Sequence, residues 1–176
     1  MNKIAYEIKQ DHNKLSLLKL GKKEKLFTSF WFMEFGKTAA EINDERGNLR
    51  FEISKKFEFW KWRMAYYIQE NSSKKNGHLL SQNSRNTIFK IDFNGNYELK
   101  IHYKKKKSVF KNGFKIAEFD ETPNENENIK LLISDEKESE IVFLLYTCLL
   151  IGETNMNQKT AFKSQKELEK NEENWF

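Results

Sequence analysis

The first three quarters of the chain alternate between apolar and polar residues with a period of two, which is typical of β-strands. In residues 3–10, for example, Ile4, Tyr6 and Ile8 fall on one face of an extended chain. We expect further strands over residues 14–20, 25–35, 39–43, 48–53, 57–68, 87–93, 97–103, 109–110, 114–119 and 129–133. The pattern therefore predicts about ten short strands before the chain changes character.

Turn residues separate several of these strands and predict antiparallel hairpins. Asp44–Gly47 ends in a glycine that can adopt a positive φ angle. Asn94 and Gly95 form the two-residue sequence that favours a type I′ turn, in which both residues have positive φ. Lys111–Gly113 is expected to be another hairpin turn, and the polar residues 71–77 are expected to be a loop.

Two stretches of the chain are rich in aromatic residues. Residues 25–35 are apolar on both faces around Trp31, which fits a strand buried on both sides or a short helix packed on a sheet, and we favour the strand. Residues 57–68 predict one long strand, because the change of phase at Phe59 and Trp60 is what a β-bulge produces. In that strand we expect Trp60 and Trp62 to face inward as core residues.

The run from Ser139 to Gly152 differs from everything around it, since residues 141–151 carry no charged side chain in a chain whose mean hydropathy is −0.81. We predict a helix over residues 139–151 that is apolar on every side and therefore enclosed by other elements. The acidic residues before it suit a helix N-terminus, and Gly152 suits its end. As a helix the run spans roughly 16 Å, about half of the ~30 Å membrane core, so we expect no transmembrane segment.

A fold with many antiparallel strands that also encloses an apolar helix is mainly β. We predict a closed antiparallel barrel of about 10–12 strands around a central hydrophobic C-terminal helix. Residues 1–152 form this domain. Residues 153–176 are mostly charged or amide residues with a few scattered apolar ones, and we expect a disordered tail or a loosely docked helix.

Composition adds limits on location and partners. Of the 176 residues, 32% are charged and 14% are aromatic, and the net charge of +5 permits attraction to phosphate or to anionic lipid. The abundance of lysine and asparagine fits an AT-rich genome equally well. Cys148 is the only cysteine and is expected to be a small buried apolar residue, and no Cys/His cluster has zinc-site spacing. The N-terminus lacks the apolar core of a signal peptide, so we expect a cytoplasmic protein, peripheral to the membrane if it binds lipid.

Several segments resemble the tubby-like superfamily, which includes tubby C-terminal domains, LURP-one-related proteins and phospholipid scramblases. The hairpins at 42–53 and 89–101 are similar to its D-x-x-G turns. The stretches 113–120, 128–133 and 141–151 resemble its last strands and central helix. The resemblance covers residues 1–152 and implies a barrel of about twelve strands around a C-terminal helix, with the lipid-head-group or membrane-surface theme of some members. No ligand-binding residue is carried over by position.

The residues reveal no catalytic constellation. His12, His78 and His102 are far apart and are expected to be surface residues, and no phosphate-binding loop or nucleophile motif is present. We therefore expect a protein that is not an enzyme and that holds no metal or cofactor. The candidate ligand-binding residues are lysines that could form one outer basic patch across two hairpins: Lys100, Lys104, Lys105, Lys106, Lys107, Lys111 and Lys115. A solvated lysine turn that protects a sheet edge has the same composition.

The favoured function is a non-enzymatic intracellular barrel that binds anionic phospholipid head groups or a membrane surface through this patch. The alternative is a nucleic-acid-binding or protein-interaction module. Trp60, Lys61, Trp62 and Arg63 interleave aromatic and basic side chains, as in proteins that stack on nucleic-acid bases, and the C-terminal tail could bind a protein partner. A ligand carrier with an empty barrel is disfavoured because the apolar helix would occupy the cavity.

Overall fold

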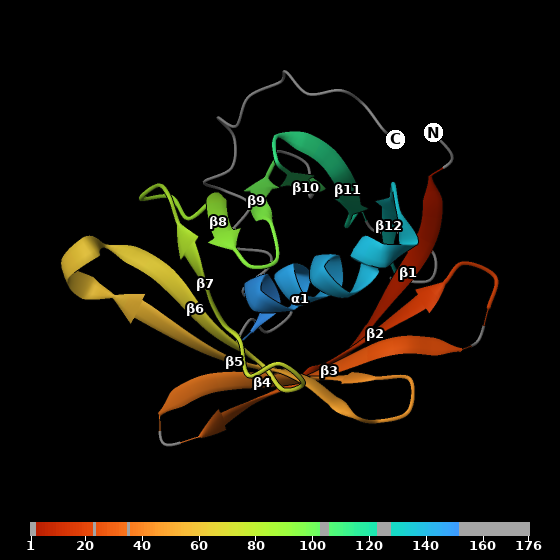
Figure 1. Ribbon diagram of the computed structural model, residues 1–176, viewed down its shortest axis with the longest axis horizontal. Helices are drawn as coiled ribbons and strands as arrows, with labels where there is room; N and C mark the ends of the chain where they lie inside the picture. Colours follow the sequence, from red (N-terminus) through yellow and green to blue (C-terminus); the bar gives the residue numbers. More distant parts are fainter. Residues whose placement is uncertain (1–2, 23, 35, 103–105, 123–127, 152–176) are drawn as a thin grey trace.

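The computed structural model describes residues 3–22, 24–34, 36–102, 106–122 and 128–151. Within them the chain forms a closed antiparallel barrel of twelve strands around one helix, as Figure 1 shows. The strands are β1 (Ile4–Asp11), β2 (Lys14–Lys19), β3 (Lys25–Glu34), β4 (Lys37–Asp44), β5 (Leu49–Glu58), β6 (Arg63–Glu70), β7 (Asn76–Ser81), β8 (Ile88–Asp92), β9 (Asn96–Ile101), β10 (Lys106–Lys111), β11 (Phe114–Asp120) and β12 (Ile129–Ile133). The helix is α1 (Ser139–Leu150), and short 3₁₀ turns lie at Phe59–Lys61 (η1) and Glu136–Glu138 (η2).

The barrel is a simple meander in which each strand pairs with its neighbours in sequence and β1 pairs with β12 to close the sheet. Because consecutive strands are antiparallel, their connections alternate between the two ends of the barrel. The connection from β12 to α1 lies at the end where β1 begins, and we call this the entry end. The opposite end, where α1 finishes, is the exit end. It carries the β1–β2, β3–β4, β5–β6, β7–β8, β9–β10 and β11–β12 connections.

The interior is filled by α1 and by the inward-facing row of every strand. Ten of the twelve residues of α1 are buried, and the eight of them other than Ser139 and Thr147 join one core cluster with inward residues such as Ile8, Leu17, Phe51, Leu99 and Leu131. Phe119 of β11 stacks on Tyr146 of the helix with a centroid distance of 4.5 Å. Each fully buried aliphatic or aromatic side chain contributes about 1.5–3 kcal/mol to folding, so the apolar run stabilises the barrel that encloses it.

Polar contacts fasten both ends of the helix to the barrel wall. At the entry end, Arg50 Nε donates to Glu140 Oε1 at 2.7 Å, and Lys19 Nζ donates to Glu136 at 2.8 Å. At the exit end, Lys55 Nζ donates to the carbonyl oxygen of Ile151 at 2.8 Å, which satisfies a group that the end of the helix leaves without a partner in the helix. These contacts fix how far the helix reaches along the barrel.

Most expectations from the sequence are confirmed, including the closed barrel, the C-terminal helix and the strand at 25–34. The predicted β8–β9 hairpin is present with positive φ angles of 56° at Asn94 and 137° at Gly95, but its connection has three residues, 93–95, where the sequence predicted two. Asp44 accepts backbone hydrogen bonds from Arg46 and Asn48 at its turn. The expectation that both faces of β3 are buried is wrong, because Phe30 and Met33 are exposed. The predicted tail, residues 153–176, lies outside the described residues, as does Gly152.

The single long strand expected at residues 57–68 is wrong. The chain forms a hairpin there: β5 ends at Glu58, η1 turns the chain, and β6 begins at Arg63, with Glu58 and Arg63 paired across the hairpin. Trp60 and Trp62 lie in the turn and are exposed, not core residues. Strand β7 was also missed, because its first residues were assigned to the 71–77 loop. In the structure Gly77 is buried there, and a Cβ atom would lie 2.6 Å from the ring of Phe93.

The burial of Cys148 gives a direct test of the enclosed helix. The thiol is fully buried, and this burial raises its pKa far above the ordinary value, so the reactive thiolate is suppressed. We expect no reaction with a thiol reagent such as DTNB in native buffer and full labelling of the thiol in concentrated urea. Rapid labelling of the native protein would show that α1 is accessible and would contradict the enclosed position.

Candidate functional site

The structure describes five of the seven lysines of the predicted basic patch and places them in different surroundings. Lys100 and Lys115 lie on the outer face of β9–β11, where Lys100 Nζ pairs with Glu98 at 3.1 Å and Lys115 Nζ pairs with Glu118 at 2.6 Å. His102 lies beside them and is half-buried, not a surface histidine as expected. Lys90 Nζ also contacts Glu98, at 3.0 Å. The lysines brought together here are therefore accompanied by carboxylates.

Lys107 and Lys111 point to other parts of the molecule. Lys107 is buried in the barrel, where its ammonium pairs with Glu121 and lies 5.6 Å from the ring centroid of Tyr146. The Tyr146 hydroxyl donates to the same carboxylate at 2.6 Å. Lys111 lies at the entry end and donates to Glu138 Oε1 at 2.6 Å.

Lys106 begins β10 at the exit end and is half-buried, while Lys104 and Lys105 lie outside the described residues. The predicted patch therefore does not form one face among the lysines that the structure describes. It includes the outer pair Lys100 and Lys115, the interior Lys107 and the entry-end Lys111.

The buried pair of Lys107 and Glu121 should matter for stability. Lys107→Met keeps much of the side-chain volume but leaves the carboxylate of Glu121 uncompensated in a site where both side chains are at most 15% exposed. We expect the free energy of unfolding to fall by about 3–5 kcal/mol in a urea titration. The matched control is Lys90→Met, which removes a lysine that is 57% exposed from a carboxylate that keeps Lys100 as a partner, and should cost less than about 1 kcal/mol. An equal, small effect of both substitutions would contradict the buried pairing.

His102 should make stability depend on pH. Burial first, and then the nearby charges of Lys115 and Lys100, lower its pKa to about 4 from an ordinary value of 6.5. Between these values the unfolded chain binds more protons than the folded one, so the free energy of unfolding should decrease as the pH falls from about 6.5 towards about 4. We expect His102→Gln to reduce the loss of stability measured between about pH 7 and about pH 5, where most carboxylates remain ionised. The same loss in the variant would exclude this role.

A more distinctive feature is the aromatic tip, which we define as Phe57, Phe59, Trp60 and Trp62 at the turn of the β5–β6 hairpin. Their exposed fractions are 42%, 63%, 95% and 60%. Figure 1 shows this hairpin projecting past the exit end of α1. Large apolar side chains at such exposure are unusual when they are contiguous, and contiguous apolar patches mark sites of interaction.

The rings of the aromatic tip contact one another and form one apolar unit. Trp62 packs edge-on against Phe57 and Phe59 with centroid distances of 5.6 and 5.5 Å, and Phe59 packs against Trp60 at 6.0 Å. The backbone of Trp62 is left-handed, with φ 48° and ψ 46°, and its amide donates to the carbonyl oxygen of Phe59 at 3.1 Å. A left-handed conformation costs a tryptophan on the order of 1 kcal/mol, and glycine would adopt it freely.

The outer face of the same hairpin is polar. Glu58 accepts hydrogen bonds from Arg63 Nε at 2.6 Å and from the Tyr67 hydroxyl at 3.2 Å, while Lys61 Nζ lies 3.9 Å from its carboxylate. The Arg63 and Tyr67 hydrogen bonds and the nearby cations lower the pKa of Glu58, so its carboxyl group stays ionised. Lys56, also on this face, is exposed. The hairpin is therefore amphipathic, with the aromatic rings on one side and charges on the other.

The exposed large apolar residues are distributed unequally between the two ends. Within the described ranges, the exit end has the four residues of the aromatic tip and Met33, whereas the entry end has Leu20 and Phe114; Phe30 is exposed within β3. Sequence reasoning missed the tip because it placed the tryptophans in a continuous strand. The signal that could have revealed it was the phase change at Phe59 and Trp60, together with a proposed strand much longer than the usual 5–6 residues.

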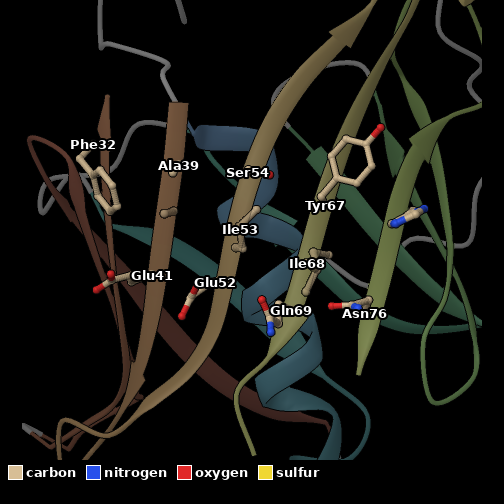
Figure 2. A pocket seen from close by; sticks show the side chains of 12 residues that line it. Phe32, Ala39, Glu41, Glu52, Ile53, Ser54, Tyr67, Ile68, Gln69 and Asn76 are labelled. Atoms are coloured by element: carbon tan, nitrogen blue, oxygen red, sulfur yellow. The ribbon is translucent and has the colours of Figure 1, made fainter. Parts of the chain in front are cut away.

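A groove lies on the outer face of β3–β7 and has a volume of about 450 Å³. Figure 2 shows its floor of small residues, Ala39 and Ser54, between the rings of Phe32 and Tyr67. Below this row, Glu41 and Glu52 face each other across β4 and β5, followed by the amides of Gln69 and Asn76. The groove can donate and accept hydrogen bonds, but its lining includes no group of three metal-ligating side chains, a grouping that the described part of the chain lacks altogether.

The comparisons with other proteins add no further identification. No family model, no curated protein and no solved structure matches this chain. The described residues also include no helix that is both long enough and apolar enough to span a membrane. The structure establishes the architecture of the described residues, a closed twelve-stranded antiparallel barrel with a C-terminal helix.

Proposed function

We propose that this protein is a non-catalytic barrel that attaches to a membrane surface through the aromatic tip. The observation that carries the proposal is the exposure of Phe57, Phe59, Trp60 and Trp62 together at the end of one projecting hairpin. Tryptophan and phenylalanine favour the boundary between lipid head groups and acyl chains, because their rings are large and apolar and the indole keeps a polar N–H. Burying each ring there contributes free energy in proportion to the apolar area removed from water.

The backbone of the tip also suits insertion. A segment that enters the head-group region loses water, so its peptide groups need partners within the protein. The hydrogen bond from Trp62 N to Phe59 O closes the turn, and Glu58 and Arg63 are paired across the hairpin directly behind it. The tip can therefore enter the interface as a preformed unit with few ordering costs.

The filled interior supports an external binding site. Because α1 occupies the barrel, a lipid cannot be held inside in the manner of an empty-barrel carrier. The resemblance to the tubby-like superfamily is part of the same proposal: the closed barrel around a C-terminal helix agrees with the arrangement it implies, and a membrane-surface role agrees with the theme of some members.

Binding of single-stranded nucleic acid is the alternative for the same residues, since Trp60 and Trp62 alternate with Lys61 and Arg63. Two observations favour the membrane. The rings pack edge-to-face into one cluster and do not stand apart as parallel platforms for bases. Arg63, the cation best suited to stacking on bases, is held by Glu58 at 2.6 Å on the opposite face of the hairpin.

Vesicle co-sedimentation of the full chain tests the proposal. We expect Trp60→Ala to weaken binding roughly tenfold, which corresponds to about 1.4 kcal/mol of lost ring burial. Trp62→Gly should weaken binding comparably while preserving or slightly raising stability in urea, because glycine suits the left-handed backbone. The matched control is Phe114→Ala, which removes a ring that is 78% exposed at the entry end and should leave binding unchanged.

Three results would overturn the proposal. The first is no binding of the wild-type protein to vesicles of any composition, and the second is an equal loss in Phe114→Ala. The third is tight binding to single-stranded DNA that is abolished by Trp60→Ala and falls steeply with salt, which would assign the tip to nucleic acid.

A further inference from the structure

We infer that the aromatic tip selects an anionic membrane surface, and that the cations responsible are Lys56 and Lys61 of the β5–β6 hairpin. Four lysines of the predicted patch, Lys100, Lys107, Lys111 and Lys115, are not part of this attraction. This inference rests on the proposed membrane attachment and specifies its partner: a bilayer interface containing acidic phospholipid. Two observations support the selection of an anionic surface. One side of the hairpin is aromatic and the other is charged, and some of the described cations already have carboxylate partners within the protein.

The aromatic side and the charged side of the hairpin are arranged as in an interfacial amphipathic element. Strand residues alternate between faces, so Phe57 belongs to one side while Lys56 and Glu58 belong to the other. Lys61 lies in the turn itself, between the two exposed indoles, and its side chain is 65% exposed. With the rings buried in the interface, lysine stems of this length can extend upward and place their ammonium groups at head-group level.

The charge balance of the hairpin is positive. Residues 55–63 contain Lys55, Lys56, Lys61 and Arg63 against one acid, Glu58. Lys55 donates a hydrogen bond to the carbonyl oxygen of Ile151 at the end of the helix, and Arg63 forms an ion pair with Glu58 at 2.6 Å. Lys61 makes only a long contact of 3.9 Å with the same carboxylate, and no contact that the described residues provide compensates Lys56. These two ammonium groups are therefore available to lipid phosphate or carboxylate groups.

The described lysines of the predicted patch are less available. Lys100, Lys107, Lys111 and Lys115 each have a carboxylate partner, and the Lys107 and Lys111 groups face the helix, at the exit and the entry end respectively. A cation already paired within the protein gains little from an external anion, because the second contact replaces the first. We therefore expect the attraction to anionic lipid to come from Lys56 and Lys61 of the hairpin and not from these four lysines.

The test compares two variants that remove the same charge from different places. Lys56→Gln/Lys61→Gln neutralises the hairpin, and Lys90→Gln/Lys100→Gln neutralises two lysines on the outer face of β8–β9 that share Glu98. Binding is measured with vesicles of phosphatidylcholine alone and with vesicles that also contain phosphatidylserine, at low and at physiological ionic strength. Circular dichroism and urea titration confirm that each variant is folded.

We expect the wild-type protein to bind phosphatidylserine vesicles more tightly, by a margin that shrinks as salt increases. The hairpin double variant should lose most of that margin, roughly fivefold for each lysine, and keep its binding to phosphatidylcholine. The β8–β9 double variant should keep the margin. Glu58→Gln, which removes the acid from the hairpin, should increase both the margin and its dependence on salt.

The possible failures are distinguishable. Equal binding of the wild-type protein to both vesicle types would refute the anionic selection and leave the membrane attachment intact. Loss of the margin in the β8–β9 double variant, or its survival in the hairpin double variant, would refute the assignment to Lys56 and Lys61. No binding to either vesicle would refute the attachment itself.

Discussion

Burial of the apolar helix is the constraint on which the rest of the structure depends. A segment that is apolar on every side cannot rest on one face of an open sheet, because half of its surface would remain in water. The twelve strands surround α1 and bury ten of its twelve residues, and closure also removes the edge strands that an open sheet would expose. Contacts such as Arg50 to Glu140 at one end and Lys55 to Ile151 at the other then set the position of the helix along the barrel.

Filling the barrel with its own helix restricts which surfaces of the protein can bind another molecule. An interior filled by the chain's own helix leaves the outer face and the two ends for binding, and the two ends differ in character. The exit end carries the aromatic tip, which is held by a left-handed tryptophan backbone that glycine would adopt more easily. Keeping an indole in that conformation at 60% exposure gives the folded chain little stabilisation, and the proposed membrane attachment would bury the ring.

The candidate site was much harder to predict than the fold. Residues 104–107 stand out in the sequence as a run of four lysines, yet Lys107 points into the barrel and pairs with Glu121. Strand alternation fixes only which residues share a face, and the partners of each lysine come from strands distant in sequence. The aromatic tip was hidden for a local reason: the F-W-K-W turn contains no glycine, proline or asparagine, so it lacks the residues that usually indicate a hairpin.

By itself, the sequence determined the class of the fold, because two-residue periodicity, turns such as Asn94-Gly95 and one uncharged apolar run each constrain the chain locally. Those signals require only neighbouring residues and a need for burial. The tertiary structure alone decided which charges are compensated, which end exposes its aromatic rings, and that residues 57–68 turn back on themselves. These outcomes depend on pairing between β5 and β6 and on ion pairs such as Lys107 with Glu121, whose partners are distant in the sequence or on another strand. The only local sign of them was the change of phase at Phe59 and Trp60.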